Sequence, residues 1–242
     1  MKQTTLKTCR LVSIVAVATA LLYASVAIAK TKEELAAEFP NIAVEQLDDS
    51  PIPGLYRLRV GPDIAYIDSE GRYFLRGDIV NLESGVNVTE KHRAKARLLA
   101  LEMIDPNDMI VYDAEKPEHW ITVFTDVDCA FCRMFHQEID EYTKRGIEVR
   151  YLVYPRTQPG SPSWIKAEQV MCSDDRHDAL TTAKLGKGID AEVCEVTAVR
   201  ENVMMGQAMQ LRATPAIVTD QGRVMYGYVS PDDLLTELNR TP

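Results

Sequence analysis

The 242-residue sequence is poor in the side chains that most often bind transition metals, with five cysteines and four histidines. Cys129 and Cys132 form a C-x-x-C pair, but a structural zinc site needs two further soft ligands in regular spacing. The other candidate ligands show no such spacing: Cys172, Cys194, His119, His136 and His177. We therefore expect no metal site and no cofactor.

Positive charge is also scarce. The sequence has 27 basic and 36 acidic residues, a formal net charge of −9. Three of the basic residues and none of the acidic ones lie in residues 1–29, so the rest of the chain carries 24 basic and 36 acidic residues, net −12. Because like charges repel, an acidic chain is a poor ligand for phosphate backbones and anionic lipids. We expect no nucleic acid and no anionic membrane surface as partner.

A long apolar run occurs at the N-terminus. Basic residues precede the apolar stretch Leu11–Ile28, and Ala27-Ile28-Ala29 fits the small-x-small cleavage pattern of a secretory signal. We predict that residues 1–29 are a signal peptide, removed on export. The alternative is a retained membrane anchor, because the apolar run approaches spanning length.

Export changes the interpretation of the cysteines. Cys9 would leave with the signal peptide, so four cysteines would remain in an oxidising compartment. An even number there is typical of disulfide-forming pairs. We expect a redox pair, Cys129 with Cys132, and a structural pair, Cys172 with Cys194.

The C-x-x-C pair lies between a strand-like and a helix-like segment. Ile121–Thr125 is apolar and β-branched, as in a buried strand. Arg133–Arg145 is helix-like and ends at Gly146. A thiol at a helix N-terminus faces unpaired N–H groups and the positive end of the helix dipole, which favour the reactive thiolate. We therefore predict a redox dithiol, with a structural disulfide or half of a zinc site as alternatives.

Residues 30–88 are expected to form a small helix-plus-sheet domain. Thr31–Glu34 has the pattern of a capping box that begins a helix. Turn residues then separate three strand-like runs, Tyr56–Val60, Ile64–Asp68 and Tyr73–Arg76. Because so few residues give a thin core, we expect this domain to pair with a second copy through its edge strands.

Residues 89–107 are expected to form a linker helix, capped by Thr89 and running from Glu90 to Ile104. Its first half carries alternating basic residues, which we interpret as a solvated face: Lys91, Arg93, Lys95 and Arg97.

Residues 108–242 alternate between strand-like and helix-like segments, which predicts a layered α/β domain. The expected strands are Met109–Tyr112, Trp120–Thr125, Ile147–Tyr154, Ala216–Thr219 and Val224–Tyr228. A helix-rich insertion spans Ser161–Leu211, and Ser230 begins a last helix. Thr214-Pro215 directly precedes a strand, where proline is tolerated at the first residue.

The order strand, C-x-x-C, helix, strand, insertion, Thr-Pro, hairpin, helix is thioredoxin-like. Three stretches, Trp120–Asp126, Gly146–Leu152 and Arg212–Ala216, resemble the bacterial periplasmic disulfide isomerases of the DsbC/DsbG family. The resemblance covers nearly the whole chain after residue 29. It implies an α+β and α/β fold with a cystatin-like N-terminal dimerisation domain, a linker helix and a C-terminal thioredoxin-like domain with a helical insertion.

The resemblance also implies roles for individual residues. Cys129 would be the attacking thiolate and Cys132 the resolving thiol. Thr214, Pro215 and Phe131 would contact the substrate, with a cis bond before the proline. The bridge between Cys172 and Cys194 would match the structural disulfide of the family.

The function implied is that of a periplasmic disulfide isomerase and reductase. Its substrates would be misfolded or misoxidised exported proteins, held in a chaperone-like cleft of a homodimer. A membrane electron donor of the DsbD type would keep the dithiol reduced. The alternatives are a dithiol oxidase that donates disulfides and a non-enzymatic periplasmic chaperone.

The motif departs from the family at two points. Ala130-Phe131 stands where Gly-Tyr is typical, and the residues between the cysteines tune the redox poise. The carboxylate of Asp128 should raise the pKa of Cys129, unless Asp128 caps the helix or Arg133 offsets its charge.

Overall fold

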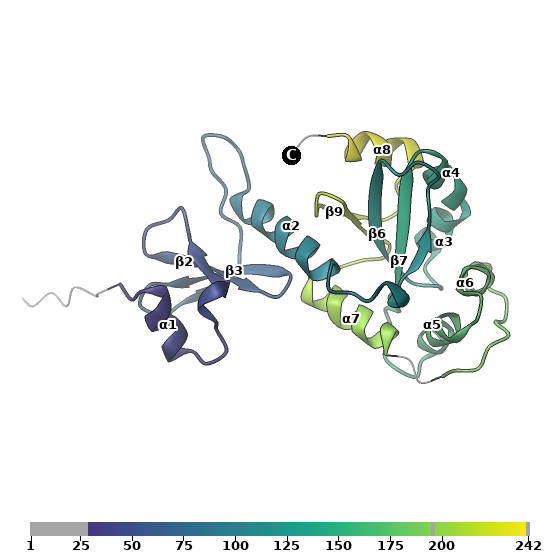
Figure 1. Cartoon of the computed structure of the whole chain (residues 1–242), viewed down its shortest axis with the longest axis horizontal. Helices are drawn as coiled ribbons and strands as arrows, with labels where there is room; N and C mark the ends of the chain where they lie inside the picture. The colour runs from purple at the N-terminus through teal and green to yellow at the C-terminus, as the bar shows by residue number, and fades with distance from the viewer. Residues whose placement is uncertain (1–28, 195–196, 241–242) are drawn as a thin grey trace, which may run out of the picture.

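The computed structural model describes residues 29–194 and 197–240. The predicted signal peptide lies outside this part of the chain, apart from Ala29. A small N-terminal unit and a larger C-terminal unit are joined by a single helix, α2 (Figure 1). No helix in the described ranges is long and apolar enough to cross a membrane.

The N-terminal unit packs one helix on a four-stranded antiparallel sheet of order β1-β2-β3-β4. Its elements are α1 (Lys32–Glu38), the 3-10 turn η1 (Val44–Gln46), β1 (Leu47–Asp49), β2 (Leu55–Val60), β3 (Asp63–Asp68) and β4 (Phe74–Leu75). Thr31 caps α1 through the expected capping box. Leu35 of α1 packs against Leu47, Leu58 and Ile67 of the sheet. Strand β1 was not predicted, because its short, acidic sequence has no apolar alternation.

Helix α2 (Val88–Leu101) begins one residue before Thr89, which we expected to cap it. The cap is Asn87, whose side-chain oxygen accepts from the Glu90 N–H at 2.8 Å. The Thr89 hydroxyl is buried instead, 2.6 Å from the Tyr66 hydroxyl. The expected cap was therefore wrong by two residues, because the sequence does not show that Thr89 is needed in the core.

The basic residues of α2 do not form the solvated face that we expected. Arg97 is 6% exposed, and it donates to the Glu90 carboxylate at 2.6 Å and to the Gly222 carbonyl at 2.9 Å. Arg93 is also partly buried and binds three carboxylates: Asp63, Asp78 and Glu90. Lys91 and Lys95 alone of the four are exposed. Arg93 thus binds α2 to the N-terminal unit, and Arg97 binds it to the larger unit.

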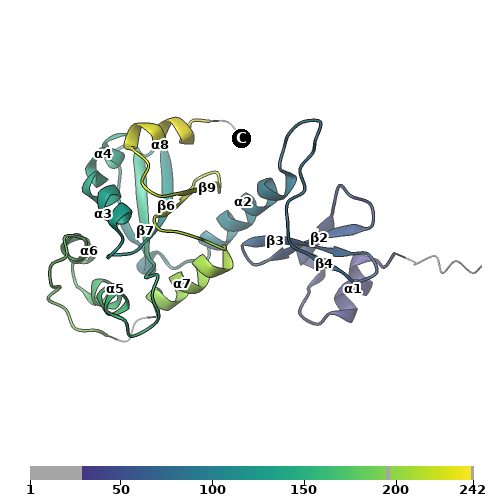
Figure 2. The ribbon, with the colours of Figure 1, turned by 180° about the vertical axis from the view of Figure 1, so that it is seen from behind.

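The larger unit is built on a five-stranded sheet of order β5-β7-β6-β8-β9. Figure 2 shows β6, β7 and β9 of this sheet with the helices around them. The 3-10 turn η2 (Pro106–Asp108) precedes it. The strands are β5 (Ile110–Tyr112), β6 (His119–Thr125), β7 (Ile147–Val153), β8 (Ala216–Thr219) and β9 (Val224–Tyr226). Strands β6 and β7 pair in parallel, and the other pairs are antiparallel.

Six helices surround this sheet: α3 (Ala130–Gln137), α4 (Ile139–Lys144), α5 (Pro162–Cys172), α6 (Arg176–Lys184), α7 (Ala198–Ala208) and α8 (Pro231–Leu238). The single helix expected after the C-x-x-C pair is broken at Glu138 into α3 and α4. It stops before Gly146, whose φ of +77° favours glycine. Helices α5, α6 and α7 lie in the predicted insertion.

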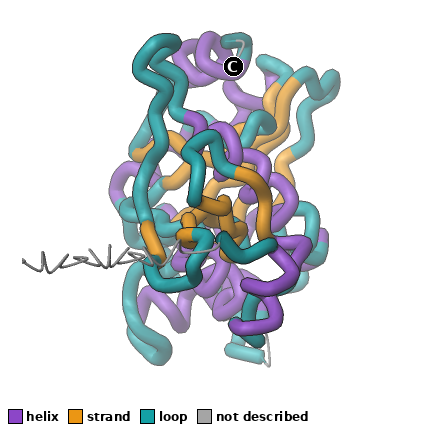
Figure 3. Tube along the Cα trace, turned by 90° about the vertical axis from the view of Figure 1, so that its left-hand side faces the viewer, coloured by secondary structure: helices purple, strands orange, loops and turns teal. Residues whose placement is uncertain are grey.

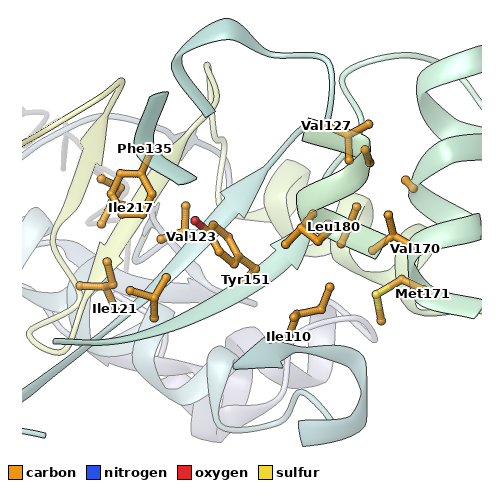
Figure 4. Packing of buried hydrophobic residues seen from close by; sticks show 14 of the residues in the cluster. Ile110, Ile121, Val123, Val127, Phe135, Tyr151, Val170, Met171, Leu180 and Ile217 are labelled. Carbon is orange, nitrogen blue, oxygen red and sulfur yellow. The ribbon is translucent and has the colours of Figure 1, made fainter. Parts of the chain in front are cut away.

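Both faces of the central sheet are covered. Val123, Tyr151 and Ile217 face one apolar cluster together with α3, α5 and α6 (Figure 4). Their chain neighbours, such as Phe124 and Leu152, face a second cluster that includes Leu101 of α2. Burial on both faces explains why the second half of β7, residues 151–153, carries three large apolar or aromatic side chains in a row. Figure 3 shows helices and strands throughout the molecule, and each unit contains both. The mixed α/β fold class is therefore confirmed.

Candidate active site

The two cysteines of the C-x-x-C pair begin helix α3. Cys129 is its N-cap residue, and Cys132 lies in its first turn. Both are free thiols. Cys129 is 4% exposed and Cys132 is fully buried. The strand β6 ends at Thr125, so the sheet fixes the point from which the helix and its thiols start.

Cys129 is held against the segment that precedes β8. Its thiol donates to the carbonyl of Thr214, with a sulfur–oxygen distance of 3.3 Å. The bond between Thr214 and Pro215 is cis. The Thr214 hydroxyl is buried and makes no hydrogen bond within the described residues. The structure thus brings the Cys129–Cys132 pair together with Thr214 and Pro215, although Thr214 lies 85 residues after Cys129.

The pKa of Cys129 lies below its ordinary value. Burial alone would raise this pKa, but hydrogen bonds to the thiolate from the Thr214 side chain and from Cys132 lower it further than burial raises it. The positive charge of Arg156 adds to the lowering. Cys129 therefore forms the nucleophilic thiolate more readily than an ordinary cysteine.

Of the alternatives left open for Asp128, the structure shows the pairing with Arg133. Asp128 makes no helix cap, and its carboxylate pairs with Lys166 at 2.9 Å and with Arg133 at 3.0 Å. These two cations offset its charge. Asp128 is not among the groups that shift the pKa of Cys129, which is lowered. The partner Lys166 was not expected, because it comes from α5, which sequence spacing does not bring to the motif.

Cys132 has the opposite character. Its sulfur accepts a hydrogen bond from the Asp126 N–H at 3.5 Å. Burial raises the pKa of Cys132 above its ordinary value, although nearby Lys184 and hydrogen bonds from Asp126 and Thr125 act against this. At neutral pH one sulfur is therefore primed to attack while the other keeps its proton.

Asp126 supports the site and was missed from the sequence. Its buried carboxylate accepts from the Asp128 N–H at 2.8 Å, from Arg156 Nε at 2.9 Å and from the Ser163 hydroxyl at 3.0 Å. Burial would raise its pKa, but these hydrogen bonds lower it overall. A charged residue directly after a buried strand was the available signal.

The remaining predicted residues differ in exposure. Phe131 is 55% exposed at the start of α3, and Met134 is exposed one turn later. Pro215 is buried, and its carbonyl accepts from the Gly227 N–H at 2.9 Å. The apolar surface beside the thiols is therefore provided by α3.

Cys172 and Cys194 form a disulfide in the helical insertion, with their Cα atoms 5.7 Å apart. It joins the end of α5 to the segment before α7. Within residues 29–194 and 197–240, no group of three or more Cys, His, Asp or Glu side chains is arranged to hold a metal ion.

Comparisons with known proteins agree with this arrangement. Residues 106–242 match the family described as a thioredoxin-like domain. Residues 23–90 match the disulfide bond isomerase protein N-terminal domain. The thiol:disulfide interchange protein DsbC of Dickeya dadantii is 34% identical over 196 residues, which are 80% of each chain. DsbC of Escherichia coli K12 is 30% identical over 196 residues, again 80% of each chain.

Among solved structures, a linker-deletion variant of ScsC from Proteus mirabilis gives a TM-score of 0.51 at 16% identity. The match covers 61% of this chain and 80% of that chain, and it shows the fold alone. The family matches and the DsbC relatives confirm the resemblance found in the sequence: this chain belongs to the DsbC family of thiol:disulfide interchange proteins.

Proposed function

We propose that this protein exchanges thiols and disulfides as an isomerase and reductase of misoxidised exported proteins in the periplasm. The observation that carries the proposal is the contrast between the two sulfurs. Cys129 has a lowered pKa and Cys132 a raised one, at the start of the same helix. This is the asymmetry that an attacking and a resolving thiol require.

The proposed reaction begins at Cys129. Its thiolate attacks one sulfur of a wrong substrate disulfide, and the other substrate sulfur leaves with the electron pair. In isomerisation, a substrate thiolate then attacks the substrate sulfur of the mixed disulfide and releases Cys129 as a thiolate. In reduction, Cys132 attacks Cys129 Sγ, so the substrate leaves reduced and the Cys129–Cys132 disulfide forms.

Thr214, Pro215 and Phe131 are proposed to bind the substrate chain. The contact between the Cys129 sulfur and the Thr214 carbonyl supports this proposal, because a substrate chain bound at this backbone would lie beside the sulfur. Exposed Phe131 and Met134 would contact apolar side chains of an unfolded substrate. Such a surface also supports a chaperone-like role.

We propose that residues 30–88 form a dimerisation domain, residues 89–107 the linker helix and residues 108–242 the catalytic domain. The edge strand β4 supports dimerisation, since Phe74 is 55% exposed and Leu75 is also exposed. Exposed apolar side chains continue in the loop after β4: Val80, Leu82 and Val86. A row of unpaired edge groups beside apolar side chains favours pairing with a second copy.

A membrane electron donor of the DsbD type is proposed to reduce the Cys129–Cys132 disulfide after each reductive cycle. Without such a donor, each reduced substrate would leave the protein oxidised and inactive as an isomerase.

Refolding of scrambled ribonuclease tests the proposal. The reduced wild-type protein should restore ribonuclease activity, and Cys129→Ser should not. Cys132→Ser should accumulate a mixed disulfide through Cys129, visible by non-reducing electrophoresis. Equal, negligible refolding by wild type and Cys129→Ser would contradict the proposed function.

A further inference from the structure

Lys184 is a buried cation that the exchange chemistry described above does not use. It is the last residue of α6 and is 4% exposed. Its Nζ donates to the hydroxyl of Thr125 at 2.7 Å. It forms no ion pair with any carboxylate in the described ranges of the chain. An unpaired buried charge is costly, so stability alone would favour an apolar side chain here.

Thr125 connects this lysine to the resolving thiol. It is the last residue of β6, and the N–H of the next residue, Asp126, donates to the Cys132 sulfur at 3.5 Å. The Thr125 hydroxyl also acts to lower the pKa of Cys132. Lys184 and Cys132 are also close enough for their charges to attract each other. The amine of Lys184 and the hydroxyl of Thr125 therefore lie together beside the segment that contacts the Cys132 sulfur.

Other titratable or charged groups face Lys184 from the turn after β6, from α3 with its N-cap, and from β7. They are Asp126, Cys129, Arg133, His136 and Tyr151. Burial lowers the pKa of His136 to about 3, so this ring is neutral at physiological pH. Burial raises the pKa of Tyr151 well above its ordinary value, so its phenol keeps its proton. Neither ring can therefore accept a proton from Cys132 near neutral pH.

Lys184 differs from both rings in where it titrates. Burial lowers its pKa to about 8. At pH 7 roughly a tenth of such a group is the neutral amine, which is a base. Cys132 needs a base because its raised pKa keeps it protonated and its burial excludes bulk water.

We propose that Lys184, acting through the Thr125 hydroxyl, takes the proton of Cys132 when this thiol resolves a mixed disulfide. This inference rests on the exchange function proposed above. The Cys132 proton passes to the Thr125 oxygen while the Thr125 hydroxyl proton passes to Lys184 Nζ. The Cys132 thiolate attacks Cys129 Sγ, the bond from Cys129 to the substrate sulfur breaks, and the substrate leaves as a thiolate. The ammonium left at Lys184 balances the charge that develops on sulfur.

The proton also has a route out of the protein. A cavity of about 250 Å³ between α3 and the end of α6 is lined by Arg133, His136 and Lys184. Water in this cavity can receive the proton from the ammonium and return the lysine to its neutral form.

Stopped-flow reaction of the reduced full-length mature protein with dithiobis(nitrobenzoate) tests this inference, because its two coloured products report the two thiols separately. Attack by Cys129 releases the first nitrothiobenzoate, and attack by Cys132 on the mixed disulfide releases the second. Lys184→Met should slow the second release at least about tenfold at pH 7.5 and leave the first release at the wild-type rate, as for loss of a general base. Thr125→Val should slow the same step, and exposed Lys187→Met is the matched control that should slow neither.

The pH profile separates proton transfer from a merely structural role. In the wild-type protein the second release should speed up with pH and level off near pH 8, where Lys184 becomes neutral. In Lys184→Met it should keep rising to higher pH. A second release of wild-type rate and wild-type pH profile in Lys184→Met would overturn the inference while leaving the exchange function intact. Absence of the first release in the wild-type protein would instead contradict the exchange function itself.

Discussion

Two thiols three positions apart differ in chemistry because their surroundings differ. The thiolate of Cys129 receives hydrogen bonds at a helix start, whereas Cys132 lies beneath that start in the apolar core. The C-x-x-C spacing predicted the pair, and the family resemblance implied the role of each sulfur. The groups that create the difference come from β6, α5, α6 and the Thr214 segment, and only the folded chain brings them together.

Thr214→Val should raise the pKa of Cys129. The variant loses the side-chain hydroxyl that favours the thiolate, while burial, which favours the thiol, remains. Thiolate formation then moves to higher pH, which the pH dependence of iodoacetamide alkylation measures. Thr214→Ser keeps a hydroxyl and should keep the wild-type profile. If Thr214→Val titrates like the wild-type protein, the Thr214 hydroxyl does not set this pKa.

Lys184→Met should stabilise the protein at pH 7. The pKa of Lys184 falls from 10.5 to about 8 on folding. Folding therefore destabilises the ammonium form, relative to the neutral amine, by up to about 3 kcal/mol. Between pH 8 and 10.5 the unfolded chain binds more protons than the folded chain, so wild-type stability rises with pH across this window. The advantage of the variant should shrink over the same window.

Urea unfolding of wild type and Lys184→Met at pH 7 and at pH 10 measures this difference. A variant that is less stable than wild type at pH 7 would show that the ammonium contributes to the fold. Lys184 could not be singled out from the sequence, because a lysine in the last turn of a helix is usually solvated.

At the level of elements, most helices and strands were predicted from local patterns. Strand β8 has the expected bounds, and Ser230 caps α8 as expected. The errors have tertiary causes. The Thr89 hydroxyl forms a buried hydrogen bond with the Tyr66 hydroxyl, and the arginines of α2 bind partners in both units. These contacts join residues that are distant in the sequence, so no local pattern reveals them.

Gly222→Ala should loosen the contact between α2 and the β8–β9 hairpin. Gly222 has a φ of +77°, and a Cβ at this position would lie 2.3 Å from the Ala94 carbonyl oxygen. The variant should lose about 2 kcal/mol or more of unfolding free energy, from backbone strain together with displacement of α2.

Gly227→Ala is the matched control for this prediction. Its φ is +82° in the same region of the chain, but no atom lies within 4 Å of the added Cβ. It should cost only the strain of a left-handed residue, about 1 kcal/mol. Equal shifts of the urea midpoint in the two variants would mean that the close approach to α2 does not matter.

At the level of the whole molecule, α2 links the two cores. Ala96 packs with Ile64 and Tyr66 of the N-terminal unit, and Leu101 packs beneath the central sheet of the larger unit. If β4 pairs two copies, this helix fixes how far each catalytic unit stands from the dimer axis. The sequence predicted the order of the domains, but not that buried arginines attach the linker helix to both.

Substituting Phe74 and Leu75 together by glutamate should convert the proposed dimer to a monomer. The change replaces exposed apolar groups of β4 by charges that repel across a two-fold axis. Light scattering gives the mass directly, and exposed Met103→Glu is the control that should stay dimeric. A wild-type protein that is already monomeric would contradict the proposed assembly.

The central claim is that this dithiol works as an isomerase and reductase. The most direct test of this claim is the in-cell redox state of the Cys129–Cys132 pair. Acid quenching followed by alkylation with a mass-tagged maleimide separates the two redox forms on a gel, with Cys129→Ser/Cys132→Ser as the fully blocked reference. The account predicts that most of the wild-type protein is trapped with both thiols reduced. A pair trapped mostly as the disulfide would contradict it and identify the protein as an oxidase.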